Sequence, residues 1–228
     1  MQHMESVPKD ELNKPNKEMY LLPHHAVLRP GSETTKLRVV FDASAPTQPN
    51  NASLNDILAV GPTIQDDIFT HLIRFRTYVI AFVADIEKMY RQILIDSQDR
   101  DFQRIFWRKT VNEVIGSYRL RTVTYGTACA PYLAMRVLQQ IAIDYKDEYP
   151  NASDAIMHCF YMDDLLCGAD SLEEAKKLRK EIEEVLNKGK LPLRKFRVIY
   201  TETTIDYIIV KPFQWSKRCP TLRAKSKT

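Results

Sequence analysis

Two adjacent aspartates, Asp163 and Asp164, lie between two apolar runs of the chain. The sequence Tyr-Met-Asp-Asp at 161–164 follows the apolar residues 155–160 and precedes the apolar residues 165–169. We expect these runs to be buried strands joined by a hairpin that carries both carboxylates. Because buried like charges repel one another unless a proton or a cation neutralises them, the pair predicts a site for a divalent metal ion.

The composition is that of an ordinary folded protein. The 228 residues are 44% hydrophobic and 27% charged, and the net charge of +4 is compatible with a polyanionic partner. No apolar run approaches the roughly 20 residues that span a bilayer, and the polar N-terminus does not read as a signal peptide. The four cysteines form no Cys-x-x-Cys pair, so we expect free thiols and neither a disulfide framework nor a zinc site. We therefore expect an intracellular, soluble protein with no membrane attachment.

Hydrophobic periodicity predicts an α+β fold in which strands and helices are mixed along the chain. The predicted strands are residues 20–28, 36–42, 78–84, 102–107 and 117–123, and the predicted helices are residues 64–76, 87–95, 130–145 and 171–188. Ser171 and Glu174 form a capping box at the start of the last helix, and Gly189 ends it. The polar residues 1–18 are expected to be disordered.

A third carboxylate, Asp85, closes the predicted strand 78–84 in the way that Asp163 follows an apolar run. Carboxylates at the ends of adjacent strands can converge on a shared pair of metal ions. Magnesium suits such a site because it prefers one or two carboxylates together with substrate phosphates, and a pair of these ions suits phosphoryl transfer. Taken alone, Asp85 is better explained as the cap of the helical turn that follows it, and it is the Asp163-Asp164 pair that favours metal binding.

Several motifs resemble those of reverse transcriptases. Ala-Asp-Ile-Glu-Lys-Met-Tyr at 84–90 and Tyr-Met-Asp-Asp at 161–164 are similar to the first and third polymerase motifs of that class. Five further segments look like the Pol polyprotein of BEL/Pao-type LTR retrotransposons: Leu-Pro-His-His at 22–25, Lys-Leu-Arg-Val-Val-Phe-Asp-Ala-Ser at 36–44, Ser-Leu-Asn-Asp at 53–56, Glu-Lys-Met-Tyr-Arg-Gln-Ile at 87–93 and Thr-Val-Thr-Tyr-Gly at 122–126. The resemblance covers about residues 20–196.

The resemblance implies the palm and most of the fingers of a right-hand polymerase, with an antiparallel palm sheet backed by helices and no thumb. The implied parts are a disordered segment at 1–18, fingers at 19–77, palm at 78–100 and 119–196, a fingers–palm connection at 101–118, and a divergent basic tail at 197–228. The tail reads as unrelated sequence, which a frameshifted or truncated element would give; a natural terminus that matches the family poorly is the alternative.

The resemblance also implies a catalytic triad. Asp85 and Asp163 would ligate two Mg²⁺ ions, or Mn²⁺ in their place, with help from the Ile86 carbonyl. Asp164 would complete the triad.

Residues around the triad would hold the incoming nucleotide. By resemblance, Tyr90 lies under the sugar, Lys36 and Arg38 hold the triphosphate, and Tyr125 with Gly126 packs against the nucleotide. Simpler readings remain open: Tyr90 as a core aromatic, the two cations as exposed charges on an edge strand, and Gly126 as a plain turn.

Five further positions have assigned or excluded roles. Tyr161 and Met162 would lie near the primer end, with a core methionine as the alternative for Met162. Lys195 falls where related polymerases place a general acid for the leaving pyrophosphate, although a surface lysine explains it as well. We expect His24 and His25 to be structural or close to the template, because no partner ligands stand at a metal-binding spacing.

The function implied is RNA-directed DNA polymerisation on an RNA or DNA template with a primer and deoxynucleoside triphosphates. The enzyme would act with the rest of Pol in cytoplasmic virus-like particles. The alternatives are an inactive retroelement relic that at most binds nucleic acid, and a host-adopted module that uses its basic surface alone. An aspartic protease is excluded because Asp-Ala-Ser at 42–44 lacks the required glycine.

Overall fold

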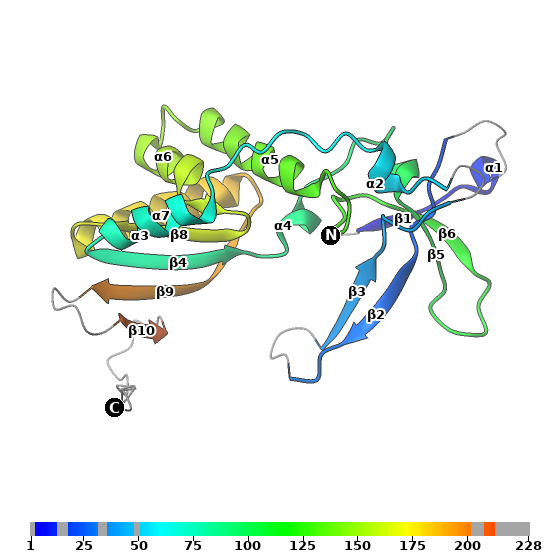
Figure 1. Ribbon diagram of the computed structural model, residues 1–228, viewed down its shortest axis with the longest axis horizontal. Helices are drawn as coiled ribbons and strands as arrows, with labels where there is room; N and C mark the ends of the chain where they lie inside the picture. Colours follow the sequence, from blue (N-terminus) through cyan, green and yellow to red (C-terminus); the bar gives the residue numbers. More distant parts are fainter. Residues whose placement is uncertain (1–2, 13–17, 32–35, 48–50, 202–207, 213–228) are drawn as a thin grey trace.

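The computed structural model describes residues 3–12, 18–31, 36–47, 51–201 and 208–212 (Figure 1). The strands are β1 (Met4–Ser6), β2 (His24–Leu28), β3 (Leu37–Phe41), β4 (Ile80–Ile86), β5 (Arg104–Trp107), β6 (Gly116–Leu120), β7 (Phe160–Tyr161), β8 (Asp164–Ala169), β9 (Leu193–Thr201) and β10 (Ile208–Pro212). The helices are α1 (Lys9–Leu12), α2 (Leu54–Ile57), α3 (Ile68–Thr77), α4 (Met89–Gln92), α5 (Ala130–Asp144), α6 (Pro150–His158), α7 (Leu172–Lys188) and the 3₁₀ turn η1 (Arg100–Gln103).

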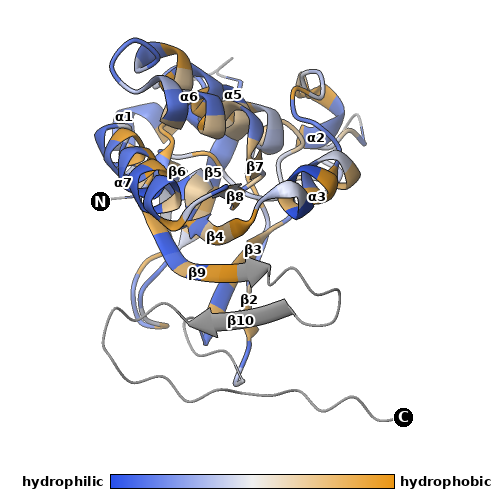
Figure 2. Cartoon of the chain, turned by 90° about the vertical axis from the view of Figure 1, so that its left-hand side faces the viewer, coloured by the Kyte–Doolittle hydropathy of each residue, from blue (hydrophilic) through white to orange (hydrophobic). Residues whose placement is uncertain are grey.

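The largest sheet has five antiparallel strands in the order β10-β9-β4-β8-β7. Helices α5, α6 and α7 lie together along one face of this sheet (Figure 1). The strand β4 is mostly apolar in Figure 2, whereas α7 is largely hydrophilic. The main core fills the space between sheet and helices, and its fully buried members include Phe82, Leu138, Ile156, Leu165 and Ile182. Burying each such side chain contributes about 1.5–3 kcal/mol.

Local sequence signals account for the two long helices. The Ser171 hydroxyl accepts a hydrogen bond from the Glu174 amide at 3.3 Å, as the capping box predicts. Helix α5 carries a proline in its first turn, where the missing N–H costs nothing. Both helices therefore confirm the predicted segments 171–188 and 130–145 to within one residue at each end.

A second group of elements lies on the other side of α4 from the five-stranded sheet (Figure 1). It comprises the sheet β1-β6-β5 and the separate hairpin β2-β3, all of it antiparallel. A smaller core holds these parts together, and its buried members are Tyr20, Leu22, Phe41, Ala43, Leu54, Ile105 and Leu120. The mixed helix and sheet content confirms the predicted α+β class.

The apolar run before the aspartates is not the strand that we expected. Residues 155–158 form the last turns of α6, and the strand β7 contains only Phe160 and Tyr161. Pro150 stands in the first turn of α6, and Ala152, Ala155 and Ile156 are buried at helical spacing. A short apolar run does not by itself distinguish a buried strand from a buried helix. The predicted helix 87–95 is likewise reduced to the single turn α4.

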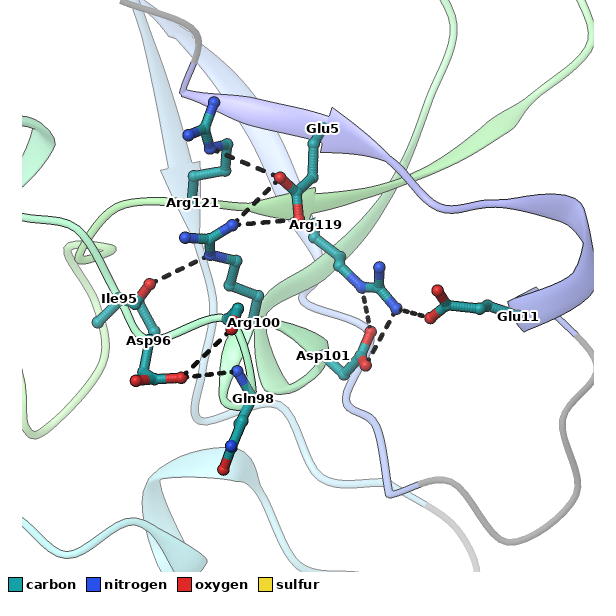
Figure 3. A network of polar contacts seen from close by, with 10 residues as sticks. Glu5, Glu11, Ile95, Asp96, Gln98, Arg100, Asp101, Arg119 and Arg121 are labelled. Atoms are coloured by element: carbon teal, nitrogen blue, oxygen red, sulfur yellow. Dashed lines mark hydrogen bonds and ion pairs between the residues drawn. The ribbon is translucent and has the colours of Figure 1, made fainter.

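The expected disorder of residues 1–18 is wrong for residues 3–12. Strand β1 pairs with β6, and the side chain of Val7 is buried. Glu5 lies between Arg100, at 3.2 Å, and Arg121, at 3.5 Å (Figure 3). The segment is polar because it is held by ion pairs, which a hydrophobicity pattern does not report.

A buried ion network joins this N-terminal segment to the sheet β1-β6-β5. The Asp101 carboxylate is buried and accepts a hydrogen bond from Arg104 Nε at 2.6 Å. Arg119 donates to both Asp101 and Glu11 (Figure 3). These partners, Asp101 foremost, raise the pKa of Arg119 above its ordinary value. Buried charges of this kind are tolerated only when they are paired.

We predict that Asp101→Asn destabilises the protein by about 3–5 kcal/mol, because Arg104 and Arg119 would lose their buried carboxylate. Urea denaturation of the purified chain measures this change. Glu173→Gln is the control, since Glu173 pairs with Lys176 on the surface and should cost less than about 1 kcal/mol. Equal losses in the two variants would contradict the prediction.

Candidate active site

The turn between β7 and β8 consists of Met162 and Asp163 alone, because Tyr161 pairs with Asp164 across the hairpin. Met162 has a φ of 56°, in the left-handed region that such tight turns require and that methionine adopts only with strain. Its amide donates a hydrogen bond to Gln65 Oε1 at 3.2 Å. Gln65, which the sequence reading did not single out, therefore helps to hold this turn.

The structure brings the predicted carboxylates to one end of the five-stranded sheet. Asp85 stands directly opposite Asp164 in the β4–β8 register, and the Ile86 amide donates to the Asp163 carbonyl at 2.8 Å. Burial, followed by the charges of Asp163 and Asp85, raises the pKa of Asp164 above its ordinary value. Helix α4 begins after Lys88, so Asp85 is not its cap.

The charge balance of Asp85 is incomplete. Its Oδ2 atom lies 2.9 Å from Lys195 Nζ, whereas its Oδ1 atom is buried and finds no hydrogen-bond partner among the described residues. Within the described residues, no group of three or more His, Cys, Asp or Glu side chains is arranged to hold a metal ion. The Asp85 Oδ1 atom without a partner and the mutual repulsion of the aspartates nevertheless fit a group of carboxylate ligands that lacks a neutralising cation.

Tyr90 lies close to these carboxylates. Its side chain is partly buried against the main core, in keeping with the simpler reading of a core aromatic. Burial raises the pKa of Tyr90, and the charge of Asp163 adds to that rise. Both readings of this residue therefore remain compatible with its position.

Two guanidinium groups lie close to the ring of Tyr125. Arg38 is 5.5 Å from the ring centroid and Arg91 is 5.0 Å from it, and the tyrosine hydroxyl donates to the Val39 carbonyl. Arg91, which the sequence reading did not single out, directly follows Tyr90 in the chain. Lys36 stands just before β3, and its carbonyl accepts from the Arg29 amide at 2.8 Å.

The backbone at Gly126 approaches β3 closely. Gly126 has a φ of 98°, and a Cβ atom built there would lie 2.6 Å from the Phe41 carbonyl oxygen. Asn55 fixes the same turn, because its Nδ2 donates to the Gly126 carbonyl at 3.1 Å and its Oδ1 accepts from the Ala128 amide at 2.8 Å. Close backbone packing therefore explains the glycine, whatever ligand the turn contacts.

We predict that Gly126→Ala lowers the free energy of unfolding by about 1–3 kcal/mol, because the new methyl group meets a backbone oxygen at a left-handed φ. Urea denaturation measures the loss. The control is Gly31→Ala, since no atom lies within 4 Å of the position that its Cβ would take. Unchanged stability in Gly126→Ala would show that the turn relaxes freely.

A pocket of about 210 Å³ lies beside the turn of the β7–β8 hairpin. The residues that line it include Met162, Gln65, and Pro131, Tyr132 and Met135 of α5. Met162 is thus placed at a hollow next to the carboxylates. His24, the first of the two adjacent histidines at 24–25, lies elsewhere. Its ring packs against the ring of Phe41, with centroids 5.9 Å apart.

His71 supports the hairpin from helix α3. Its ring is 3% exposed and lies edge-on to Tyr161, with centroids 5.8 Å apart. Burial lowers the pKa of His71; the charge of Arg74 acts in the same direction, and Asp66 and Asp67 partly offset both.

We predict that folding weakens as the pH falls below about 7, because the unfolded chain takes up a proton near the ordinary histidine pKa of about 6.5 that folded His71 resists. The variant His71→Phe keeps a ring against Tyr161 and should lose part of this pH dependence. Denaturation curves at pH 7.5 and 5.5 test it. His158→Gln, at an exposed histidine, should retain the wild-type difference.

Comparison with known proteins supplies the family. A family model described as "Reverse transcriptase (RNA-dependent DNA polymerase)" matches residues 32–211, whereas a comparison with curated proteins finds no match. No helix in the described part of the chain is long and apolar enough to cross a membrane. The match extends beyond Phe196 to residue 211, and β9 continues to Thr201. With well over half of its residues matched, this chain belongs to the reverse transcriptase family.

Proposed function

We propose that this chain is the RNA-directed DNA polymerase domain of a BEL/Pao-type LTR retrotransposon Pol polyprotein. Family membership supports a polymerase that uses a nucleic-acid template and nucleotide substrates. The segments at 22–25, 53–56 and 122–126 support the BEL/Pao assignment. In such an element the enzyme would work beside the other Pol domains in cytoplasmic virus-like particles.

In this proposal the five-stranded sheet and its helices α5, α6 and α7 are the palm. The hairpin β2-β3 and the sheet β1-β6-β5 belong to the fingers and to the connection between fingers and palm. This division places the candidate nucleotide-binding residues of β3 on one side of α4 and the carboxylates on the other. A primer end and a nucleotide would meet between them.

The observation that carries the proposal is the convergence of Asp85, Asp163 and Asp164 at one end of adjacent antiparallel strands. Three carboxylates in this arrangement serve no packing purpose, and burial together with the charges of Asp163 and Asp85 raises the pKa of Asp164. Phosphoryl transfer is the chemistry that uses such a set, because developing negative charge must be balanced there.

Asp85, Asp163 and Asp164, with the Ile86 carbonyl, would hold two Mg²⁺ or Mn²⁺ ions. These ions would lower the pKa of the primer 3′-hydroxyl and stabilise charge on the transferring phosphate.

The remaining residues of the site would position the substrates. Tyr90 would lie under the incoming sugar and exclude a 2′-hydroxyl. Tyr161 and Met162 would contact the primer end, where the Gln65 hydrogen bond keeps the turn in place.

Four residues in or near β3 would hold the nucleotide itself. Arg38 would bind the triphosphate, aided by Lys36, because a guanidinium can grip phosphate through two parallel hydrogen bonds. Tyr125 and Gly126 would pack against the nucleotide, and the nearby guanidinium groups of Arg38 and Arg91 would hold the Tyr125 ring in a fixed orientation.

We predict that the chain extends a primer on a homopolymer template with Mg²⁺ or Mn²⁺, and that Asp163→Asn lowers the rate by about 100-fold or more, as expected when charge stabilisation in the transition state is lost. Gel-resolved primer extension measures the rate. Asp154→Asn, at a side chain that is 79% exposed on α6, is the matched control and should keep wild-type activity. Template binding without extension by the wild-type chain would instead identify an inactive relic.

A further inference from the structure

A β-bulge in β9 aims Lys195 at the carboxylates. Val83 pairs with Arg197 and Asp85 pairs with Arg194, so Lys195 and Phe196 together stand opposite Ala84 alone. Lys195 has a φ of 55°, the left-handed conformation that glycine usually supplies at such bulges. Bulges of this kind redirect a side chain, and here the redirected side chain is that of Lys195.

The redirected lysine meets Asp85. Its Nζ atom lies 2.9 Å from Asp85 Oδ2, although 60% of the lysine side chain is exposed. The neighbouring Arg194 is paired with Glu87, and Lys88 also lies 3.6 Å from Glu87. The basic residues next to the site thus pair with two carboxylates, Glu87 and Asp85, and Lys195 pairs with Asp85, which belongs to the triad.

An ion pair that forms by chance on the surface would not require a β-bulge with a left-handed residue. Pairs such as Lys180 with Glu184, at 3.8 Å, form along a regular helix without any bulge. A non-glycine residue keeps a strained left-handed φ only where the surrounding contacts hold it there. Such residues are found most often at functional sites. The bulge therefore indicates a specific pairing of Lys195 with Asp85.

We propose that Lys195 is a built-in counter-ion of Asp85 that a divalent cation must displace before it binds. The inference rests on the proposed metal role of Asp85. In the absence of metal, the ammonium group offsets the repulsion among Asp85, Asp163 and Asp164. A divalent ion carries twice the charge, and all three carboxylates attract it, so it can replace the lysine.

Displacement would also have a consequence for the nucleotide. The lysine stem is long and exposed, so the released ammonium group can turn toward an anion bound beside Asp85. The ammonium group of Lys195 would then contact either the metal-free Asp85 carboxylate or the triphosphate, but not both at once. Metal binding and nucleotide binding would thereby be coupled through one residue.

Direct metal binding tests the proposal without relying on activity. We would titrate the full chain with Mn²⁺ and follow free Mn²⁺ by electron paramagnetic resonance, with no nucleotide present. Lys195→Asn removes the charge while keeping a residue that tolerates a left-handed φ, and it should tighten Mn²⁺ binding about fivefold or more, the effect of one charge pair at about 4 Å in water. Lys195→Arg retains the charge and should bind Mn²⁺ as the wild-type chain does.

Lys190→Asn is the matched control, because Lys190 is an exposed lysine with a φ of 59° that lies before β9. It should leave the Mn²⁺ affinity unchanged. An unchanged or weaker affinity in Lys195→Asn, or an equal gain in Lys190→Asn, would overturn the counter-ion role.

Asp85→Asn separates this inference from the proposed function. Weaker Mn²⁺ binding in Asp85→Asn combined with no effect of Lys195→Asn would overturn only the counter-ion role. Wild-type Mn²⁺ binding in Asp85→Asn would overturn the metal role of Asp85, and the counter-ion role with it.

Discussion

Repulsion among three aspartates at one end of the five-stranded sheet is the constraint on which the rest of the site depends. Antiparallel pairing of β4 with β8 sets Asp85 opposite Asp164, and the tight β7–β8 turn adds Asp163. Folding must therefore hold like charges together that would separate in a free chain. The stability for this comes from the apolar core under the sheet, whose strands can shift little without opening that core.

Three of the five non-glycine residues with a positive φ in the described chain lie close to this constraint. Met162, Lys88 and Lys195 all have positive φ values, and each adjoins one of the motifs that carry the carboxylates or pairs with one of them. Gln65 and Asn55 hold two of the neighbouring turns through side-chain hydrogen bonds. Strain of this kind keeps side chains in directions that relaxed strands and turns would not give them.

The chain N-terminal to the family match has a structural role of its own. Residues 3–12 add a strand to the sheet β1-β6-β5, and their ion pairs with Arg100, Arg119 and Arg121 hold that strand in place (Figure 3). Their polar composition predicted disorder because hydrophobicity scales count each charge as exposed. Whether a charge is exposed or paired depends on residues about a hundred positions away along the chain.

Local patterns by themselves determined the long helices α5 and α7, the apolar strand that ends near Asp85, and the hairpin that carries Asp163 and Asp164. These features depend on neighbours within a few residues, so capping, periodicity and turn chemistry are enough to predict them. Tertiary structure alone decided that residues 155–158 are helical, that β1 is a strand, and that Lys195 pairs with Asp85. Those outcomes depend on contacts between distant segments, whose energies no local pattern contains.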